Sequence, residues 1–112
     1  MKQLNFSPAY EAYLQDGRKT TTLRLANTQQ LAPGDEVMLT IGWSRDNARD
    51  LHRAVVTKVS RKAFGALDVD DLCGESPDCR TPEAARLVLG CIYRTVIDEQ
   101  HPVFVIGFEH AP

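Results

Sequence analysis

An alternation of polar and apolar residues near the start of the chain does most to limit the fold. The run Gly-Arg-Lys-Thr-Thr-Thr-Leu-Arg-Leu ends at Leu25. Successive side chains of a β-strand point to opposite faces. A strand over residues 20–25 therefore places Leu23 and Leu25 against the core, and places on its other face Thr20, Thr22 and Arg24. This pattern fits either a solvated edge strand, because β-branched residues favour strands, or the floor of a cleft that carries a hydroxyl beside cationic groups.

Turn and capping residues divide the rest of the chain into short elements. Ser7 followed by Pro8 predicts a helix that runs to about residue 15. The run Thr-Pro-Glu from Thr81 predicts the start of a second helix, and a short helix is expected near 67–72. Strands are expected over 3–6, 36–43, 51–60 and 101–110. Many short strands with few helices predict an α+β fold, a small mixed β-barrel of about six strands with two to three flanking helices.

Length and composition predict one domain over residues 1–112. The chain is long enough for a single hydrophobic core and too short for two. Its longest apolar stretch, 103–108, is far too short to cross a membrane, and the start of the chain has no apolar run typical of a signal peptide. An odd number of cysteines, three, favours reduced thiols and a cytoplasmic location over a disulfide framework.

Charge is distributed unevenly along the chain. Residues 45–62 hold six Lys and Arg against two Asp, whereas residues 64–83 hold six acidic residues against one Arg. Two solvated faces are the simpler interpretation. The overall net charge of −2 argues against tight non-specific binding of nucleic acid, which depends on many phosphate contacts. The basic strip, residues 45–62, is nevertheless able to guide a nucleotide or a short RNA toward a cleft.

The cysteines and the single tryptophan give weaker signals. The spacing of Cys73, Cys79 and Cys91 matches no common zinc site, and no Gly-rich phosphate loop is present, so we expect neither a metal nor a cofactor. The second helix carries an apolar stripe that is expected to pack on the barrel, with Cys91 packed beside it; the stripe consists of Ala85, Val88, Leu89 and Ile92. Trp43 ends an apolar strand, which favours packing in the core or at its rim, although it is also able to stack on a base.

The motif Gly17-Arg18-Lys19-Thr20-x-Thr22-x-Arg24, placed between a short helix and a strand, resembles the signature of the ASCH domain family. The resemblance implies a PUA-like β-barrel and a link to RNA metabolism. Small bacterial members of that family include amidohydrolases that remove the acetyl group from acetylcytidine, and they use a Lys, a Thr and a Glu. Other members are described as ribonucleases or presumed RNA binders. The implied partner is therefore a modified nucleoside or a short single-stranded RNA.

The resemblance assigns two catalytic positions directly, Lys19 and Thr22. The family's glutamate lies a few residues before the Thr that starts the late helix, and a count without gaps places Asp78 there, whereas a small insertion places Glu75 there. We expect the substrate to be bound by Arg18, Thr20, Arg24 and Trp43.

A threonine hydroxyl needs a base to remove its proton. A lysine serves only as a neutral amine, which burial or a nearby cation such as Arg18 or Arg24 favours. Strict strand alternation places Lys19 and Thr22 on opposite faces, so they converge only if Lys19 lies in a turn or at a bulge. Gly17 permits such a turn. No metal is needed for this chemistry.

Overall fold

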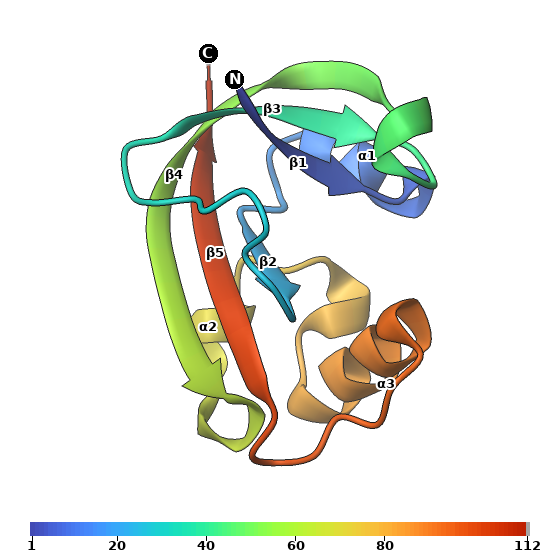
Figure 1. Cartoon of the computed structure of the whole chain (residues 1–112), viewed down its shortest axis with the longest axis vertical. Helices are drawn as coiled ribbons and strands as arrows, with labels where there is room; N and C mark the ends of the chain where they lie inside the picture. The colour runs from blue at the N-terminus through green and yellow to red at the C-terminus, as the bar shows by residue number, and fades with distance from the viewer. Residues whose placement is uncertain (112) are drawn as a thin grey trace.

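The computed structural model describes residues 1–111, apart from the side chain of Asp78, and this part of the chain forms one curled mixed sheet flanked by helices (Figure 1). The strands are β1 (Lys2–Phe6), β2 (Thr21–Arg24), β3 (Glu36–Ile41), β4 (Arg49–Ala63) and β5 (Pro102–His110). Their order in the sheet is β1-β3-β4-β5-β2. Only β1 and β3 are parallel; the other neighbours are antiparallel. The expected α+β, PUA-like barrel is confirmed, with five described strands rather than about six.

The long strand β4 connects the two halves of the sheet. Its fifteen residues pair with β3 near one end and with β5 along most of their length. The register shifts between Leu39 and Thr40 and between Val56 and Lys58. Such bulges bend a strand and increase its twist, which lets one sheet curl around two separate core clusters. The predicted strand over 51–60 was too short because both of its ends are polar.

Three described α-helices flank the sheet, and predicted caps begin two of the helical segments. Ser7 Oγ accepts a hydrogen bond from the Ala9 amide and starts a 3-10 turn (Pro8–Tyr10) that continues into α1 (Glu11–Gln15). Thr81 Oγ1 accepts from the Ala84 amide at the start of α3 (Pro82–Tyr93). The third, α2 (Val69–Leu72), is short, as expected. None of the described helices is long and apolar enough to cross a lipid bilayer.

The apolar stripe of α3 is only partly buried. Ala85 and Leu89 pack against Leu23 and Val105 in one of the two cores. Ile92 is 58 % exposed and Cys91 is also exposed, so the expectation that both pack on the barrel was wrong. Their turn of the helix extends past the sheet and lines a pocket instead.

Candidate functional site

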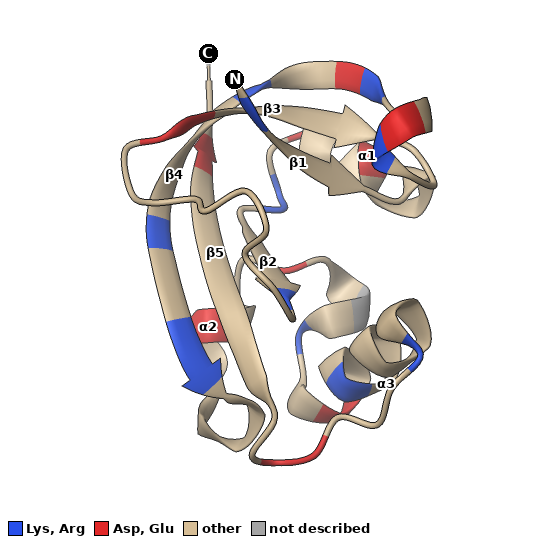
Figure 2. Cartoon of the chain, in the orientation of Figure 1, with Lys and Arg blue, Asp and Glu red and all other residues tan. Residues whose placement is uncertain are grey.

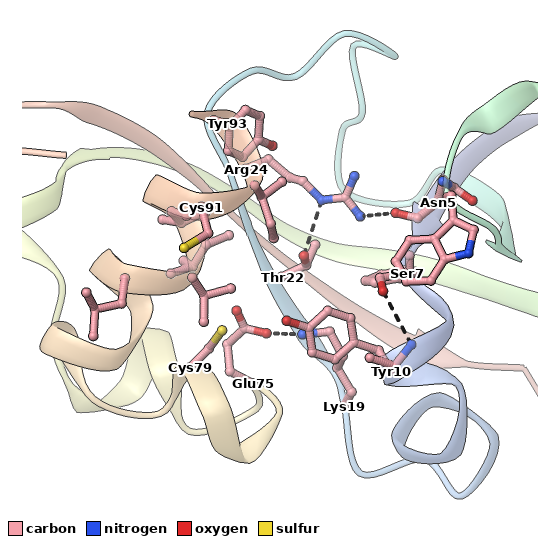
Figure 3. A pocket seen from close by; sticks show the side chains of 18 of the residues that line it. Asn5, Ser7, Tyr10, Lys19, Thr22, Arg24, Glu75, Cys79, Cys91 and Tyr93 are labelled. Atoms are coloured by element: carbon pink, nitrogen blue, oxygen red, sulfur yellow. Dashed lines mark hydrogen bonds and ion pairs between the residues drawn. The ribbon is translucent and has the colours of Figure 1, made fainter. Parts of the chain in front are cut away.

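A pocket of about 550 Å³ lies between the two halves of the molecule. Its walls come from β1 and the following 3-10 turn, from β2, from the segment around Glu75 and from α3 (Figure 3). Phe6, Tyr10 and the last turns of α3 contribute to its apolar surface. Pockets of this size and character are typical of small-molecule sites, in which a few polar groups orient the ligand.

A buried ion pair between Lys19 and Glu75 lies in this pocket. Lys19 is 2 % exposed and Glu75 is 3 % exposed. The Lys19 ammonium also lies 3.4 Å from Ser76 Oγ and 5.1 Å from the centre of the Tyr10 ring. Its charge is therefore surrounded by a carboxylate, a hydroxyl and an aromatic face rather than by water.

Backbone hydrogen bonds join the two segments that carry Lys19 and Glu75. The Gly74 carbonyl accepts the amides of Thr20 at 2.8 Å and Thr21 at 3.1 Å. An added Cβ on Gly74 would lie only 2.5 Å from Thr20 Oγ1, so a glycine is needed for this close approach. Lys19 itself lies in the turn before β2. This turn begins after Gly17, whose φ is +80°. Because Lys19 lies in this turn and not in the strand, it reaches the same pocket as Thr22.

The carbonyl of Lys19 is held by a pair of histidines. His110 Nε2 lies 2.7 Å from that oxygen, and His110 Nδ1 lies 2.7 Å from His52 Nε2. A carbonyl only accepts, so His110 donates to it through Nε2. Burial, together with the neighbouring His110, lowers the pKa of His52.

Thr22 and Arg24 form the opposite wall of the pocket. Thr22 is 5 % exposed, and its Oγ1 accepts a hydrogen bond of 3.2 Å from Arg24 Nε. Arg24 Nη2 donates to the Asn5 carbonyl at 2.7 Å, and its guanidinium lies 4.9 Å from the centre of the Phe6 ring. Burial lowers the pKa of Arg24, while the charges of Tyr93 and Glu75 act in the opposite direction. A cation therefore lies directly beside the Thr22 hydroxyl.

The structure brings Lys19, Thr22, Glu75 and Arg24 to the pocket (Figure 3). Trp43 also lines it. Trp43 lies at its rim and is 84 % exposed. Of the two alternative carboxylates, Glu75 is the one whose described side chain pairs with Lys19. Asp78 falls in the 3-10 turn Pro77–Cys79, and its side chain lies outside the described part of the structure.

Two of the expected substrate-binding residues do not line the pocket. Arg18 is exposed, pairs with Asp16 at 2.6 Å and covers the Tyr13 ring, so it points away from Lys19. Thr20 precedes the first residue of β2, and its hydroxyl lies against Gly74. Alternation applies only within a regular strand, which is why Thr20 does not share the position of Thr22.

Several lining residues have no signal in the sequence that would connect them to the site. Tyr10 comes from the first 3-10 turn, Cys79 from the segment after Glu75, and Tyr93 from the end of α3. The Tyr93 hydroxyl accepts a hydrogen bond of 3.4 Å from the Leu25 amide, which ties α3 to the end of β2. None of the three cysteines forms a disulfide within the described part of the chain. No group of three His, Cys, Asp or Glu side chains suited to a metal ion occurs among the described residues.

Much of the basic strip, residues 45–62, is already paired within the protein. Asp71 of α2 is 1 % exposed and accepts from Lys62 at 2.8 Å and from Lys58 at 3.3 Å. Burial alone would raise the pKa of Asp71, but these hydrogen bonds and one from the Asp68 amide hold it below its ordinary value. Arg49 pairs with Glu11. Figure 2 shows the acidic α2 beside the basic end of β4, so this part of the strip is not a free surface for an anion.

The fold is similar to that of solved structures with low sequence identity. The ASCH domain from Lactobacillus crispatus JV V101 is 16 % identical, with a TM-score of 0.65 over 91 % of this chain and 70 % of that one. Protein EF3133 from Enterococcus faecalis V583, assigned to family DUF984, is 16 % identical, with a TM-score of 0.62 over 92 % and 70 %. The hypothetical protein PH0355 is 17 % identical, with a TM-score of 0.70 over 99 % and 100 %.

The sequence itself matches no protein-family model and no curated protein. The structural similarity shows an ASCH-like fold, and the expected resemblance is confirmed at that level. The reaction has to be argued from the pocket itself.

Proposed function

We propose that this protein is a metal-independent amidohydrolase that removes the acetyl group from the exocyclic amine of acetylcytidine or a related acylated pyrimidine nucleoside. The observation that carries the proposal is the buried Lys19–Glu75 ion pair beside the Thr22 hydroxyl in one pocket. A buried ion pair contributes little net stability, because desolvation of the two charges offsets their attraction. A catalytic role accounts for its place in a largely apolar cavity.

Thr22 is the proposed nucleophile. Lys19 becomes a base when its proton passes to Glu75, to which it is hydrogen-bonded. The neutral amine then takes the proton of the Thr22 hydroxyl as the oxygen attacks the acetyl carbon. Arg24, which donates to Thr22 Oγ1, stabilises negative charge on that oxygen as its proton leaves.

Collapse of the tetrahedral intermediate breaks the bond between the acetyl carbon and the exocyclic nitrogen. The proton held by Glu75 moves to the leaving amine, which gives cytidine and an acetylated Thr22. Water, activated by the same Lys19–Glu75 pair, then hydrolyses the ester and releases acetate. All protons are supplied by the two side chains and by water, so no metal or cofactor takes part.

The shape and lining of the pocket support a flat, weakly polar ligand. Phe6, Tyr10 and the apolar side chains of α3 suit the faces of a pyrimidine ring. A volume of about 550 Å³ is sufficient for a nucleoside and falls within the range usual for small-molecule sites.

The test is hydrolysis of acetylcytidine by purified protein, followed by chromatographic separation of cytidine. We expect catalytic, not stoichiometric, loss of the acetyl group, unchanged by exhaustive treatment with EDTA. Glu75→Gln should lower turnover on the order of 10²-fold or more, whereas Glu83→Gln, at an exposed site in the first turn of α3, should not. Loss of activity in EDTA with recovery in zinc would refute the mechanism.

The alternative within the same fold is an RNA-binding module or a ribonuclease that uses this cleft. It predicts binding of single-stranded RNA without loss of acetylcytidine, or cleavage of RNA that disappears in the Lys19→Ala variant. Either result, obtained with protein that leaves acetylcytidine intact, would replace the proposed activity.

A further inference from the structure

A second, smaller cavity lies beside the main pocket at Arg24. Its volume is about 20 Å³, and Asn5 and Arg24 line both cavities. The main pocket is largely apolar, but the walls of the second cavity are mostly polar and include Gln3, Asn27 and Arg45. A ligand held by its base in the main pocket would therefore meet a polar surface next to Arg24.

Two guanidinium groups meet at this second cavity. Arg45 lies in the 3-10 turn Arg45–Asn47, and its Nη2 is 3.5 Å from Thr28 Oγ1. Neither Arg24 nor Arg45 forms an ion pair with a carboxylate whose side chain is described. Burial is the main reason that the pKa of Arg24 is lowered, and the charge of Arg45 lowers it further. This repulsion is unfavourable, and an anion between the two groups would relieve it.

We propose that the second cavity binds a phosphate group attached to the nucleoside whose base occupies the main pocket. This proposal rests on the proposed function, which places the pyrimidine base in the main pocket. It adds a binding site for a phosphate group of the same substrate. Arginine suits this role because its planar fork donates two hydrogen bonds to phosphate oxygens. The phosphate is a monoester in a free nucleotide and a diester in a strand, and both present the same oxygens.

Trp43 extends this surface at the rim of the main pocket. It is 84 % exposed, lies two residues before Arg45 and lines the main pocket. An exposed aromatic side chain beside an arginine is typical of surfaces that bind single-stranded nucleic acid, because a base stacks on the ring while the cation contacts the backbone. A neighbouring nucleotide, where the ligand has one, would stack on Trp43.

The test is calorimetric titration of the Thr22→Ala protein, which is expected not to consume its ligands. The ligands are acetylcytidine, its 5′- and 3′-monophosphates, and a trinucleotide with acetylcytidine at its centre. At least one monophosphate should bind about tenfold more tightly than the nucleoside, as expected for one charge-assisted contact. If the trinucleotide also binds more tightly than the nucleoside, the phosphate belongs to a strand. If only a monophosphate binds more tightly, the ligand is a free nucleotide.

Arg45→Ala should remove the gain from the phosphate and leave the affinity for acetylcytidine within about twofold, because Arg45 does not line the main pocket. Arg61→Ala is the matched control: it removes the same charge from an exposed site on β4 and should retain the gain. For the phosphorylated ligand, the slope of the logarithm of the binding constant against the logarithm of salt concentration should fall by about one in Arg45→Ala.

Equal affinity for the nucleoside and its phosphates, or an unchanged gain in Arg45→Ala, would overturn the phosphate site. Hydrolysis of acetylcytidine by the parent protein would still support the proposed function in that case. Absence of any binding by acetylcytidine, joined with absence of hydrolysis, would overturn both.

Discussion

Replacing Lys19 or Glu75 alone should destabilise the protein more than replacing both. The two side chains are 2 % and 3 % exposed, so Lys19→Met leaves a carboxylate without its cation and Glu75→Leu leaves an ammonium without its anion. Loss of one partner of a buried ion pair costs about 3–5 kcal/mol. For a chain of this length that corresponds to a fall in Tm of roughly 4 °C for each kcal/mol, or more than about 10 °C in all.

The double variant Lys19→Met/Glu75→Leu should recover most of that loss. Replacing a buried ion pair by apolar residues of similar volume is often neutral or stabilising by about 1–4 kcal/mol. The assay is urea unfolding of the parent, both single variants and the double variant, with acetylcytidine turnover measured on the same preparations. All three variants should be inactive, including the double variant that regains its stability, and this separates the catalytic role from the structural one.

An exposed ion pair on β1 gives the matched control. Lys2 and Asp35 lie 2.8 Å apart, and their side chains are 41 % and 30 % exposed. Lys2→Met should therefore change the free energy of unfolding by no more than about 1 kcal/mol. The reasoning would be refuted if Lys19→Met or Glu75→Leu changed stability as little as Lys2→Met, or if the loss in the double variant equalled the sum of the two single losses.

Two further predictions concern the surroundings of the ion pair. Gly74→Ala should lower stability by about 1–3 kcal/mol, because the added Cβ would lie 2.5 Å from Thr20 Oγ1 and displace the Glu75 segment. The same displacement should lower kcat more than it raises KM. Unchanged kinetics and an unchanged Tm would refute this. The pKa of His52 is lowered from its ordinary value of 6.5, so the folded state favours neutral His52 and stability should fall as pH decreases below that value. Unfolding in urea from about pH 7.5 to about pH 5 should show a weaker pH dependence in His52→Gln, and an identical pH dependence in the variant would contradict the assignment.

The regular parts of the fold could be predicted from the sequence because their signals are local. Ser7 and Thr81 cap helices through hydrogen bonds to amides two and three residues away, so the capping pattern is readable without tertiary information. Alternation likewise placed Leu23 in the core. The length of β4 was underestimated because its polar ends pair with distant strands, and sequence patterns do not record such pairing.

The candidate site was only partly predictable, because tertiary contacts assemble it from segments with no common period. The motif over residues 17–24 predicts Lys19 and Thr22 as a pair, and both line the pocket, but counting residues did not choose between Asp78 and Glu75. That choice depends on the irregular segment between α2 and α3, where Gly74 fixes the approach to β2 through its carbonyl. Arg18 was expected near Lys19 from its position in sequence, yet it pairs with Asp16 on the outside of the turn.

The most direct test of the proposed mechanism is the rate at which Thr22→Ala hydrolyses acetylcytidine, compared with Thr21→Ala. Thr22 lines the pocket beside Arg24, whereas the neighbouring Thr21 lies against Gly74 outside it. Removal of the nucleophile should lower kcat on the order of 10²-fold or more, and Thr21→Ala should retain most of the activity. If Thr22→Ala hydrolyses acetylcytidine at nearly the parent rate, the threonine is structural, water is the nucleophile, and the mechanism proposed for this pocket is wrong.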